Sequence, residues 1–302
     1  MALKIVDSHF HFYDKKINHH PFLANYDENL ALLWGKDYQQ KLPESYLPAD
    51  YFRDMNEFQI DGLVMAELVS TDPLKEMQFA QDIANQNPQL SAAIANISLR
   101  DENLSQLLDE YLKIPLIRSV RDHLLWDPNN PNRCYTDKAG ILLEPIIKES
   151  FAILKNYPFN FEFEVYAHEI PSVLHYAEQF PTIKFALHCL GWPLDQTQTG
   201  FSKWKKDMQR LSQCHNVSVK ITAIECIFGL EWSFTQIAPW IKTTIDIFRP
   251  MRCMFGSHLP ITKCSKGASA LYETYQAIVK EFSLQEQQSL FADTAKNFYN
   301  IS

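Results

Sequence analysis

Eight short apolar runs recur along the chain, and most are separated from the next by a segment with helical spacing of apolar residues. The runs predict strands at residues 4–8, 62–67, 91–97, 116–120, 160–165, 183–187, 217–221 and 252–255. The intervening patterns predict helices at residues 75–85, 104–112, 141–157, 172–179, 201–213, 234–248 and 266–282. Strands that alternate with helices form parallel sheets, and eight such units fit a closed barrel better than an open sheet. The sequence therefore predicts an α/β protein with a single (β/α)8 TIM-barrel domain over residues 1–302.

Two segments, residues 18–48 and 121–138, fall outside this alternation. The first is rich in aromatic and polar residues, and the second is rich in asparagine and proline. We predict a long loop in each, after the first and the fourth strand. Ordered loops longer than about 12–15 residues usually carry function in compact domains. Both segments are therefore expected to shape the site and to decide which substrate it takes.

The composition argues against several classes of partner. Lys and Arg number 28 and Asp and Glu number 36, so the formal net charge is −8, and no basic stripe is present. An acidic chain of this kind is a poor nucleic-acid binder. No apolar stretch approaches the roughly 18 residues that suggest a membrane span. We therefore expect neither a nucleic-acid nor a membrane partner.

The cysteines and the N-terminus bear on the compartment. The six cysteines form no C-x-x-C pair, and the opening residues MALKIVDSH contain no apolar signal segment. Disulfides are rare in reducing compartments, and a chain of this size does not need them. The pattern predicts a cytoplasmic protein with reduced thiols. We expect no nucleotide cofactor.

Histidines gather where the predicted strands end, which is where TIM-barrel enzymes place their catalytic groups. Six of the ten histidines lie at such ends, namely His9, His11, His123, His168, His188 and His258. His9, His11, His188 and His258 are the strongest candidates, because each ends or closely follows an apolar strand. Loop exposure explains His123 and His168 equally well.

Three charged residues also lie at or near strand ends. Glu67 ends the second predicted strand, Arg121 follows the fourth, and Lys220 lies within the seventh. Glu67 can face the barrel mouth and pair with Arg121 or Lys220. A charged side chain inside a strand, such as that of Lys220, needs either a partner or a function.

Five motifs in the chain carry a resemblance to a known family. They are DSHFHFYD, VRDHLLWDPNNP, FALHCLGWP, NVSVKITAIE and RCMFGSHLPI, in this order. Together they resemble the amidohydrolase-related branch of the amidohydrolase superfamily, and most of all its lactonase-like TIM-barrel hydrolases. The resemblance covers essentially the whole chain.

This resemblance implies a set of site residues. His9, His11 and His188 would form the active site with an acidic residue at the end of strand eight, which takes a proton from the attacking water. Arg121 would bind a substrate carboxylate or a developing oxyanion. The other expected substrate contacts are Lys220, Glu67, His168 and Trp192. A divalent metal, most readily zinc, could be held by His9, His11 and His188, weakly or not at all.

The sequence departs from the family pattern at the proton acceptor. The family typically has G-S-D-W-P at strand eight, whereas this chain reads G-S-H-L-P at residues 256–260. His258 thus replaces the catalytic aspartate. An imidazole can act as a general base near neutral pH and can bind zinc, but it supplies no negative charge. The family's Lys-Ser-Gly on strand seven is also altered, because Ile221 and Thr222 follow Lys220 here.

Three functions remain open from the sequence. The leading hypothesis is a hydrolase that opens a lactone or related cyclic ester of a sugar acid or an aromatic acid, with His258, His188, His9 and His11 as catalytic residues. The alternatives are a metal-dependent decarboxylase of the same branch and a non-catalytic barrel that binds a small molecule. In each case the partner is a small molecule, and a homodimer is compatible with the sequence.

Overall fold

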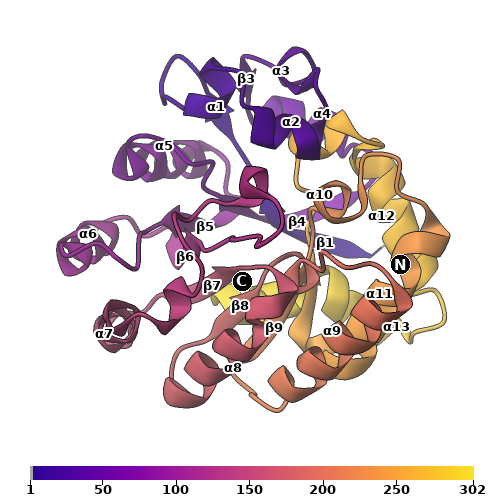
Figure 1. Cartoon of the computed structure of the whole chain (residues 1–302). Helices are drawn as coiled ribbons and strands as arrows, with labels where there is room; N and C mark the ends of the chain where they lie inside the picture. Colours follow the sequence, from indigo (N-terminus) through magenta and orange to yellow (C-terminus); the bar gives the residue numbers. More distant parts are fainter. Residues whose placement is uncertain (1–2) are drawn as a thin grey trace.

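The computed structural model describes residues 3–302 and contains an eight-stranded parallel sheet that curls into a barrel (Figure 1). In neighbour order its strands are β1 (Lys4–Phe10), β4 (Gln59–Ala66), β5 (Leu90–Asn96), β6 (Ile117–His123), β7 (Asn160–Glu164), β8 (Phe185–Leu187), β9 (Val217–Ile221) and β10 (Cys253–Phe255). Spatial order follows chain order, as expected for successive β/α units. The predicted (β/α)8 TIM barrel is confirmed, with all eight predicted strands present.

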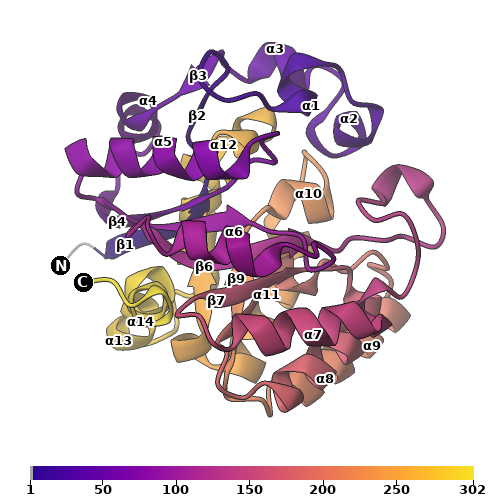
Figure 2. The same cartoon turned by 90° about the vertical axis from the view of Figure 1, so that its left-hand side faces the viewer.

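Helices cover the outside of the barrel (Figures 1 and 2). They are α4 (Pro48–Asp54), α5 (Pro73–Gln86), α6 (Leu104–Tyr111), α7 (Pro145–Leu154), α8 (Ile170–Gln179), α9 (Gln198–Leu211), α11 (Phe234–Phe248) and α12 (Gly267–Ile278). Helix α7 is shorter than the predicted 141–157, because Pro145 begins it and residues 141–143 form a separate 3-10 turn. Proline suits the first turn of a helix, where its missing N–H leaves no hydrogen bond unmade.

The C-terminal segment closes the bottom of the barrel. Helix α13 (Leu284–Gln288), a π-turn (Ser289–Asp293) and α14 (Thr294–Tyr299) follow α12. Phe298 of α14 packs in one buried cluster with the strand residues Val64, Ile94 and Met254. Figure 2 shows α14 on the side where both chain ends lie, with α2 (Glu28–Trp34) and α10 (Ile224–Phe228) toward the other side. The C-terminal segment thus covers one end of the barrel. The opposite end, where the strands have their C-termini, remains available for a site.

The first and last strands, β1 and β10, form no hydrogen-bonded ladder within residues 3–302. Two backbone bonds join the segments that follow them. The N–H of His258 donates to the His9 carbonyl at 2.8 Å, and the N–H of His11 donates to the Leu259 carbonyl at 2.7 Å. Gly256 permits this approach, because a Cβ at that position would lie 2.8 Å from the Cβ of His9. We call this junction the β1–β10 seam.

The side chain of Asp7 strengthens the seam. Its buried carboxylate accepts hydrogen bonds from the backbone N–H of Ser257 at 2.9 Å and from the hydroxyl of Tyr51 at 2.8 Å. It also accepts from the N–H of His9 at 3.2 Å. Burial raises the pKa of the Asp7 carboxyl, although these bonds to Ser257 and Tyr51 oppose the shift. Asp7 therefore links β1 to the end of β10.

The segment 18–48 differs from the expected long loop. It holds three short helices, α1 (Pro21–Ala24), α2 (Glu28–Trp34) and α3 (Tyr38–Lys41), and it ends in β3 (Ser45–Tyr46), which pairs antiparallel with β2 (Tyr13–Asp14). Helix α2 begins at a cap, because the Asp27 side chain accepts from the backbone N–H groups of Asn29 and Leu30. The segment is therefore a folded lobe over the barrel mouth.

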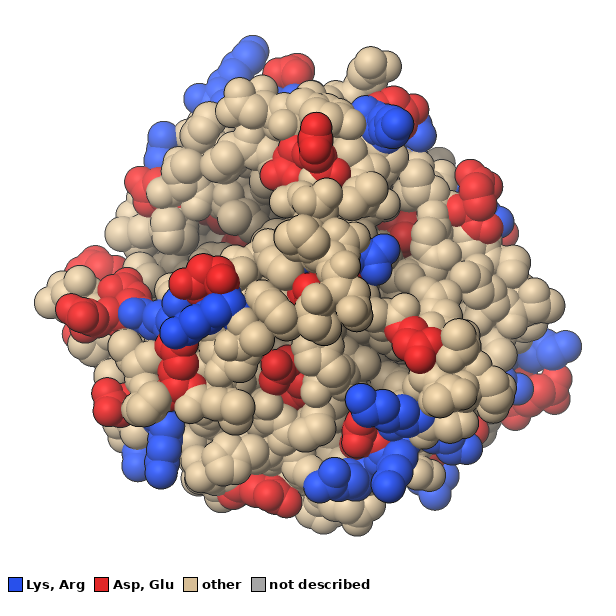
Figure 3. Space-filling view, in the orientation of Figure 1, with Lys and Arg blue, Asp and Glu red and all other residues tan. Residues whose placement is uncertain are grey.

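The second segment also differs from its predicted bounds. Strand β6 runs to His123, so Arg121 and His123 belong to the barrel, and the loop begins only at residue 124. Its regular structure is limited to 3-10 turns at Pro131–Arg133 and Ile141–Leu143. Among the described residues, no helix is long and apolar enough to cross a membrane. On the face seen in Figure 3, basic and acidic side chains are interspersed.

Candidate active site at the barrel mouth

Four histidines lie together at the C-terminal ends of the strands. His9 and His11 come from the end of β1, His188 directly follows β8, and His258 lies just beyond β10. The ring centroid of His9 lies 5.0 Å from that of His11, 5.1 Å from that of His188 and 5.0 Å from that of His258. All four residues are buried. The structure thus brings together the four histidines that the sequence favoured, and we call them the histidine cluster.

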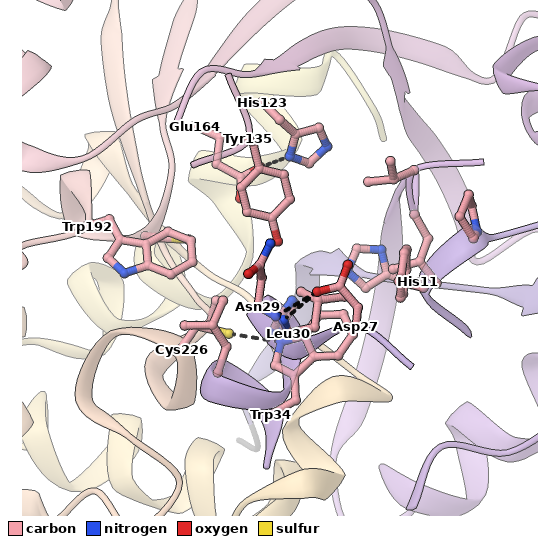
Figure 4. A pocket seen from close by; sticks show the side chains of 18 of the residues that line it. His11, Asp27, Asn29, Leu30, Trp34, His123, Tyr135, Glu164, Trp192 and Cys226 are labelled. Carbon is pink, nitrogen blue, oxygen red and sulfur yellow. Dashed lines mark hydrogen bonds and ion pairs between the residues drawn. The ribbon is translucent and has the colours of Figure 1, made fainter. Parts of the chain in front are cut away.

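A cavity of about 390 Å³ has His9, His11 and His258 in its wall. Both segments outside the β/α alternation contribute, the first through α1 and α2 and the second through Tyr135. Figure 4 shows Trp192 and His11 on opposite sides of this space, with Tyr135 and Trp34 between them. The aromatic side chains of the wall are Phe22, Tyr26, Trp34, Tyr135 and Trp192. The cavity lining therefore combines the polar rings of three histidines with five aromatic side chains.

The ring nitrogens of the histidine cluster differ in their hydrogen-bond partners. His11 donates from Nδ1 to the Ala66 carbonyl at 3.0 Å, and Nδ1 of His258 lies 2.5 Å from Oε1 of Glu225. Neither ring nitrogen of His9 has a hydrogen-bond partner within residues 3–302. Burial holds the pKa of both His9 and His11 well below the usual range, and the charge of Lys220 adds to the effect on His9. Both rings are therefore neutral at pH 7, and Nε2 of His11 carries a lone pair.

Three of these imidazoles can share one metal ion. One ring nitrogen each from His9, His11 and His258 lies within 4.8 Å of the other two. Zinc is commonly bound by neutral imidazoles, and in His11 and His258 the second ring nitrogen is anchored by a hydrogen bond. This group has His258 where the expected set has His188, whose Nε2 is engaged by Glu162. The donor set fits a divalent metal.

A buried network lies beside His188. Glu162 on β7 accepts from Nε2 of His188, from Nζ of Lys220 at 2.9 Å and from the hydroxyl of Tyr299 at 2.8 Å. Although burial opposes it, the charge of Lys220 holds the pKa of Glu162 well below its usual range. Burial and the charge of Lys220 lower the pKa of His188 to about 4. Lys220 is not among the residues that line the cavity and is instead paired with Glu162, so its expected contact with a substrate stays a prediction.

Four charged side chains form ion pairs with one another at one side of the cavity. Arg121 donates from Nε to Oε1 of Glu67 at 2.5 Å, and its Nη1 lies 3.4 Å from Glu164. His123 lies 2.8 Å from a carboxylate oxygen of each of the two glutamates. Burial opposes the charge on His123, but Glu164 and Glu67 outweigh it and raise its pKa to about 10. Two cations and two carboxylates thus neutralise one another, and we call them the charge quartet.

The other residues expected to contact a substrate differ in whether they line the cavity. Trp192 lines the cavity, as expected. Glu67 is fully buried behind Arg121 and is absent from the wall, so it supports Arg121 instead of touching a ligand. His168 keeps 32% of its side chain exposed and lines a separate hollow beside Asp195. His168 is thus not among the residues that line the cavity beside the histidine cluster, and its expected contact with a substrate stays a prediction.

Sequence reasoning missed four residues of the site, namely Glu162, Glu164, Glu225 and Tyr135. A signal for the first two existed, because Glu162 and Glu164 alternate with Phe161 and Phe163 in β7. Successive residues of a strand point to opposite faces, so the glutamates face the barrel interior while the phenylalanines pack outside. Glu225 is the last residue of the NVSVKITAIE motif and lies four positions beyond the end of β9.

A parallel barrel with a histidine cluster and a cavity at its mouth is the architecture of a TIM-barrel enzyme. The model of the amidohydrolase family matches residues 6–301, so the chain belongs to this family. The chain is 22% identical to the L-fucono-1,5-lactonase of Burkholderia multivorans over 99% of its own length and 97% of that protein.

Solved structures with the same fold include two of interest. An amidohydrolase from Burkholderia multivorans with bound zinc is similar with a TM-score of 0.79 and 18% identity, over 99% of each chain. A 5-carboxyvanillate decarboxylase from Novosphingobium aromaticivorans, solved with manganese, is similar with a TM-score of 0.65 and 11% identity, over 99% of this chain and 96% of that one. The family match supports an enzyme, and the two solved structures show that proteins of this fold include a zinc-bound amidohydrolase and a manganese-bound decarboxylase.

Proposed function

We propose that this chain is a hydrolase that opens a lactone or related cyclic ester of a sugar acid or an aromatic acid. One observation carries the proposal. His258 lines the cavity, and because its Nδ1 is bound to Glu225, only Nε2 is left to accept a proton. A buried imidazole in this state is a suitable general base for water. The 22% identity to a lactonase over nearly the whole chain supports the same reaction class.

The reaction moves one proton. As the water oxygen bonds to the lactone carbonyl carbon, one water proton passes to Nε2 of His258. The ring C–O bond then breaks, and Nε2 returns the proton to the departing oxygen. The product is an open-chain hydroxy acid, and His258 is restored. His9 and His11, neutral beside His258, hold no charge that would oppose the imidazolium while it exists.

A divalent metal held by His9, His11 and His258 would supply Lewis-acid polarisation of a carbonyl oxygen. His258 has one free ring nitrogen, however, and a metal on Nε2 leaves none to accept a proton. We therefore propose that hydrolysis is carried by the metal-free protein and that zinc at this site inhibits it.

The charges of the cavity wall favour an uncharged lactone. The donors that Arg121 turns toward Glu67 and Glu164 are already engaged, which differs from its expected role as a carboxylate receptor. An added substrate carboxylate would also meet the carboxylate of Glu164 in the wall. Aromatic side chains such as Trp34 and Trp192 can pack against the face of an uncharged ring.

The test is an assay of chelator-treated protein on uncharged sugar lactones and on a dicarboxylated pyrone. We expect kcat/KM for the best uncharged lactone to exceed that for the pyrone by at least about tenfold, which is roughly 1.4 kcal/mol. His258→Ala should lower kcat by about a hundredfold or more. Added zinc should slow the reaction, and turnover that requires zinc would contradict the proposal.

The three-imidazole group also supports one other function, a metal-dependent decarboxylase. That function predicts stoichiometric zinc that survives dialysis against a chelator, and release of carbon dioxide from a carboxylated aromatic acid. A chain that binds lactones but turns over neither class of substrate would instead be a non-catalytic barrel.

A further inference from the structure

Glu225 makes a single side-chain hydrogen bond within residues 3–302, and its partner is His258. The side chain of Glu225 is 0% exposed and that of His258 is 9% exposed. A carboxylate removed from water costs several kcal/mol unless it is paired. Oε1 is hydrogen-bonded to the imidazole of His258, and Oε2 has no hydrogen-bond partner within these residues.

The backbone fixes both members of the pair. Glu225 lies in the first turn of α10 (Ile224–Phe228), which begins at Ala223 in a left-handed conformation with φ of 52° directly beyond β9. His258 also has a left-handed φ, of 57°, and its N–H is bound across the seam to His9. Since β9 and β10 are paired neighbours, the segments that follow them place the Glu225 carboxylate beside the His258 imidazole.

We infer that Glu225 is a positioning residue for His258, and that the Glu225–His258 pair does the work of the aspartate that is absent at the end of strand eight. The inference rests on the proposed hydrolase. A carboxylate can only accept, so the proton of the neutral ring is held on Nδ1 and the lone pair is left on Nε2. When Nε2 takes a proton from water, Nδ1 keeps its own, and the carboxylate stabilises the imidazolium. No proton passes to Glu225.

The pairing of Glu225 with His258 predicts the effect of a return to aspartate at position 258. Alone, His258→Asp would place a second carboxylate near the buried carboxylate of Glu225, and like charges in a low-dielectric site oppose ionisation. The new aspartate would then be a poor base. With Glu225→Gln the repulsion is removed, so the double variant should be better than His258→Asp. The two positions should therefore be strongly non-additive.

The first measurement needs no substrate. Nitrogen-15 NMR of the metal-free protein at one pH reports which nitrogen of His258 carries the proton, with the signal assigned by its absence from His258→Gln. We expect the Nδ1–H form in the natural protein and in the control Glu231→Gln, which changes an exposed glutamate three residues beyond α10. In Glu225→Gln the amide can also donate to Nδ1, so the Nε2–H form should appear. Identical spectra in all three proteins would overturn the inference.

The second measurement uses the best lactone. Glu225→Gln should lower kcat by about a hundredfold or more while KM stays nearly unchanged, because Glu225 does not line the cavity. His258→Asp with Glu225→Gln should exceed His258→Asp alone by at least about tenfold in kcat. Unchanged kcat in Glu225→Gln, or additive variants, would overturn the inference with the hydrolase intact. No turnover by the natural protein would instead overturn the proposed function, and the NMR result would still decide whether Glu225 sets the proton position.

Discussion

At the scale of single residues, the site depends on buried charges that neutralise one another. In the charge quartet, Arg121 and His123 lie against Glu67 and Glu164, and burial would destabilise any one of the four alone. The carboxylates hold His123 protonated, and the cations hold the pKa of both glutamates well below the usual range despite burial. The quartet therefore stabilises the mouth but depends on pH through its one histidine.

We predict that the free energy of unfolding falls less steeply with rising pH in His123→Gln than in the natural protein. The pKa of His123 is about 10 in the folded protein, against about 6.5 for a histidine in an unfolded chain. The folded state binds the extra proton between these values, so the contribution of His123 is complete below about pH 6.5 and is lost as pH rises toward 10. Urea unfolding at several pH values should show a slope up to about 1.4 kcal/mol per pH unit smaller in the variant.

The exposed His175 provides the matched control, since His175→Gln removes a histidine that forms no ion pair within residues 3–302. Equal slopes in the natural protein and in His123→Gln would contradict the charge assigned to His123.

Residues of the site could be predicted where a local rule placed them. His9, His11 and His188 end strands, so the rule for barrel enzymes found them together with His258. Glu225 and Glu164 could not be predicted, because the role of each depends on a partner that is distant in the chain. Glu225 pairs with His258, 33 positions away, and Glu164 pairs with His123, 41 positions away. Lys220 was recognised as needing a partner, but spacing alone could not identify it as Glu162.

At the scale of elements, helix α2 forms much of one wall of the cavity. It presents Asn29, Leu30, Leu33 and Trp34 to the cavity, and the indole Nε1 of Trp34 donates to Sγ of Cys226 at 3.3 Å. The helix has only two turns, so it depends on its cap and its packing more than on its own propensity. The Asp27 carboxylate accepts from Asn29 and Leu30 at 2.8 and 3.0 Å.

We predict that Asp27→Ala raises KM for the best lactone several-fold and leaves kcat within about twofold, because the catalytic histidines lie on other elements. Loss of the cap should also cost about 1 kcal/mol of stability. The control is Ser283→Ala, which removes the cap of α13 at the bottom of the barrel. Steady-state kinetics and urea unfolding of both variants separate the effects. An equal rise of KM in the two variants would show that the effect is not local to α2.

Elements with a long or repeated pattern were the ones that could be predicted. The eight strands were found even where they are short, because each β/α unit reinforces the next. The lobe at residues 18–48 was read as a loop, since α1 and α3 have four residues and α2 has seven. Helical periodicity needs a window of about 11–18 residues to stand out. Such helices form because the barrel mouth buries Leu30, Leu33 and Trp34, which no local pattern reports.

At the scale of the whole molecule, the β1–β10 seam joins the beginning of the chain to its end. His9 and His11 belong to one side of the seam and His258 to the other, so the histidine cluster exists only while the seam is closed. The buried Asp7 carboxylate spans the junction to Ser257 and is supported by Tyr51. Global stability and ligand binding should therefore be coupled.

We predict that Asp7→Asn lowers the free energy of unfolding by about 1–3 kcal/mol, because an amide cannot replace all the acceptor positions of the buried carboxylate. It should also weaken zinc binding, since the three imidazoles are no longer held together across the seam. Urea unfolding and calorimetric zinc titration measure the two effects. The control is Asp14→Asn, which removes a half-buried carboxylate that is also bound to a backbone N–H. Full zinc affinity in a destabilised Asp7→Asn would contradict the coupling.

The seam also sets when the site can form. Asp7 and Ser257 are separated by 250 positions in the chain, so their contact closes almost the longest loop that the chain contains. Contacts of this separation cost the most entropy and form slowly. On the ribosome, all eight barrel strands are synthesised before His258, the residue that completes the histidine cluster. Ligand binding is thus expected to be acquired in the last steps of folding, and a nascent chain that stops before β10 would hold most of a barrel and no reaction centre.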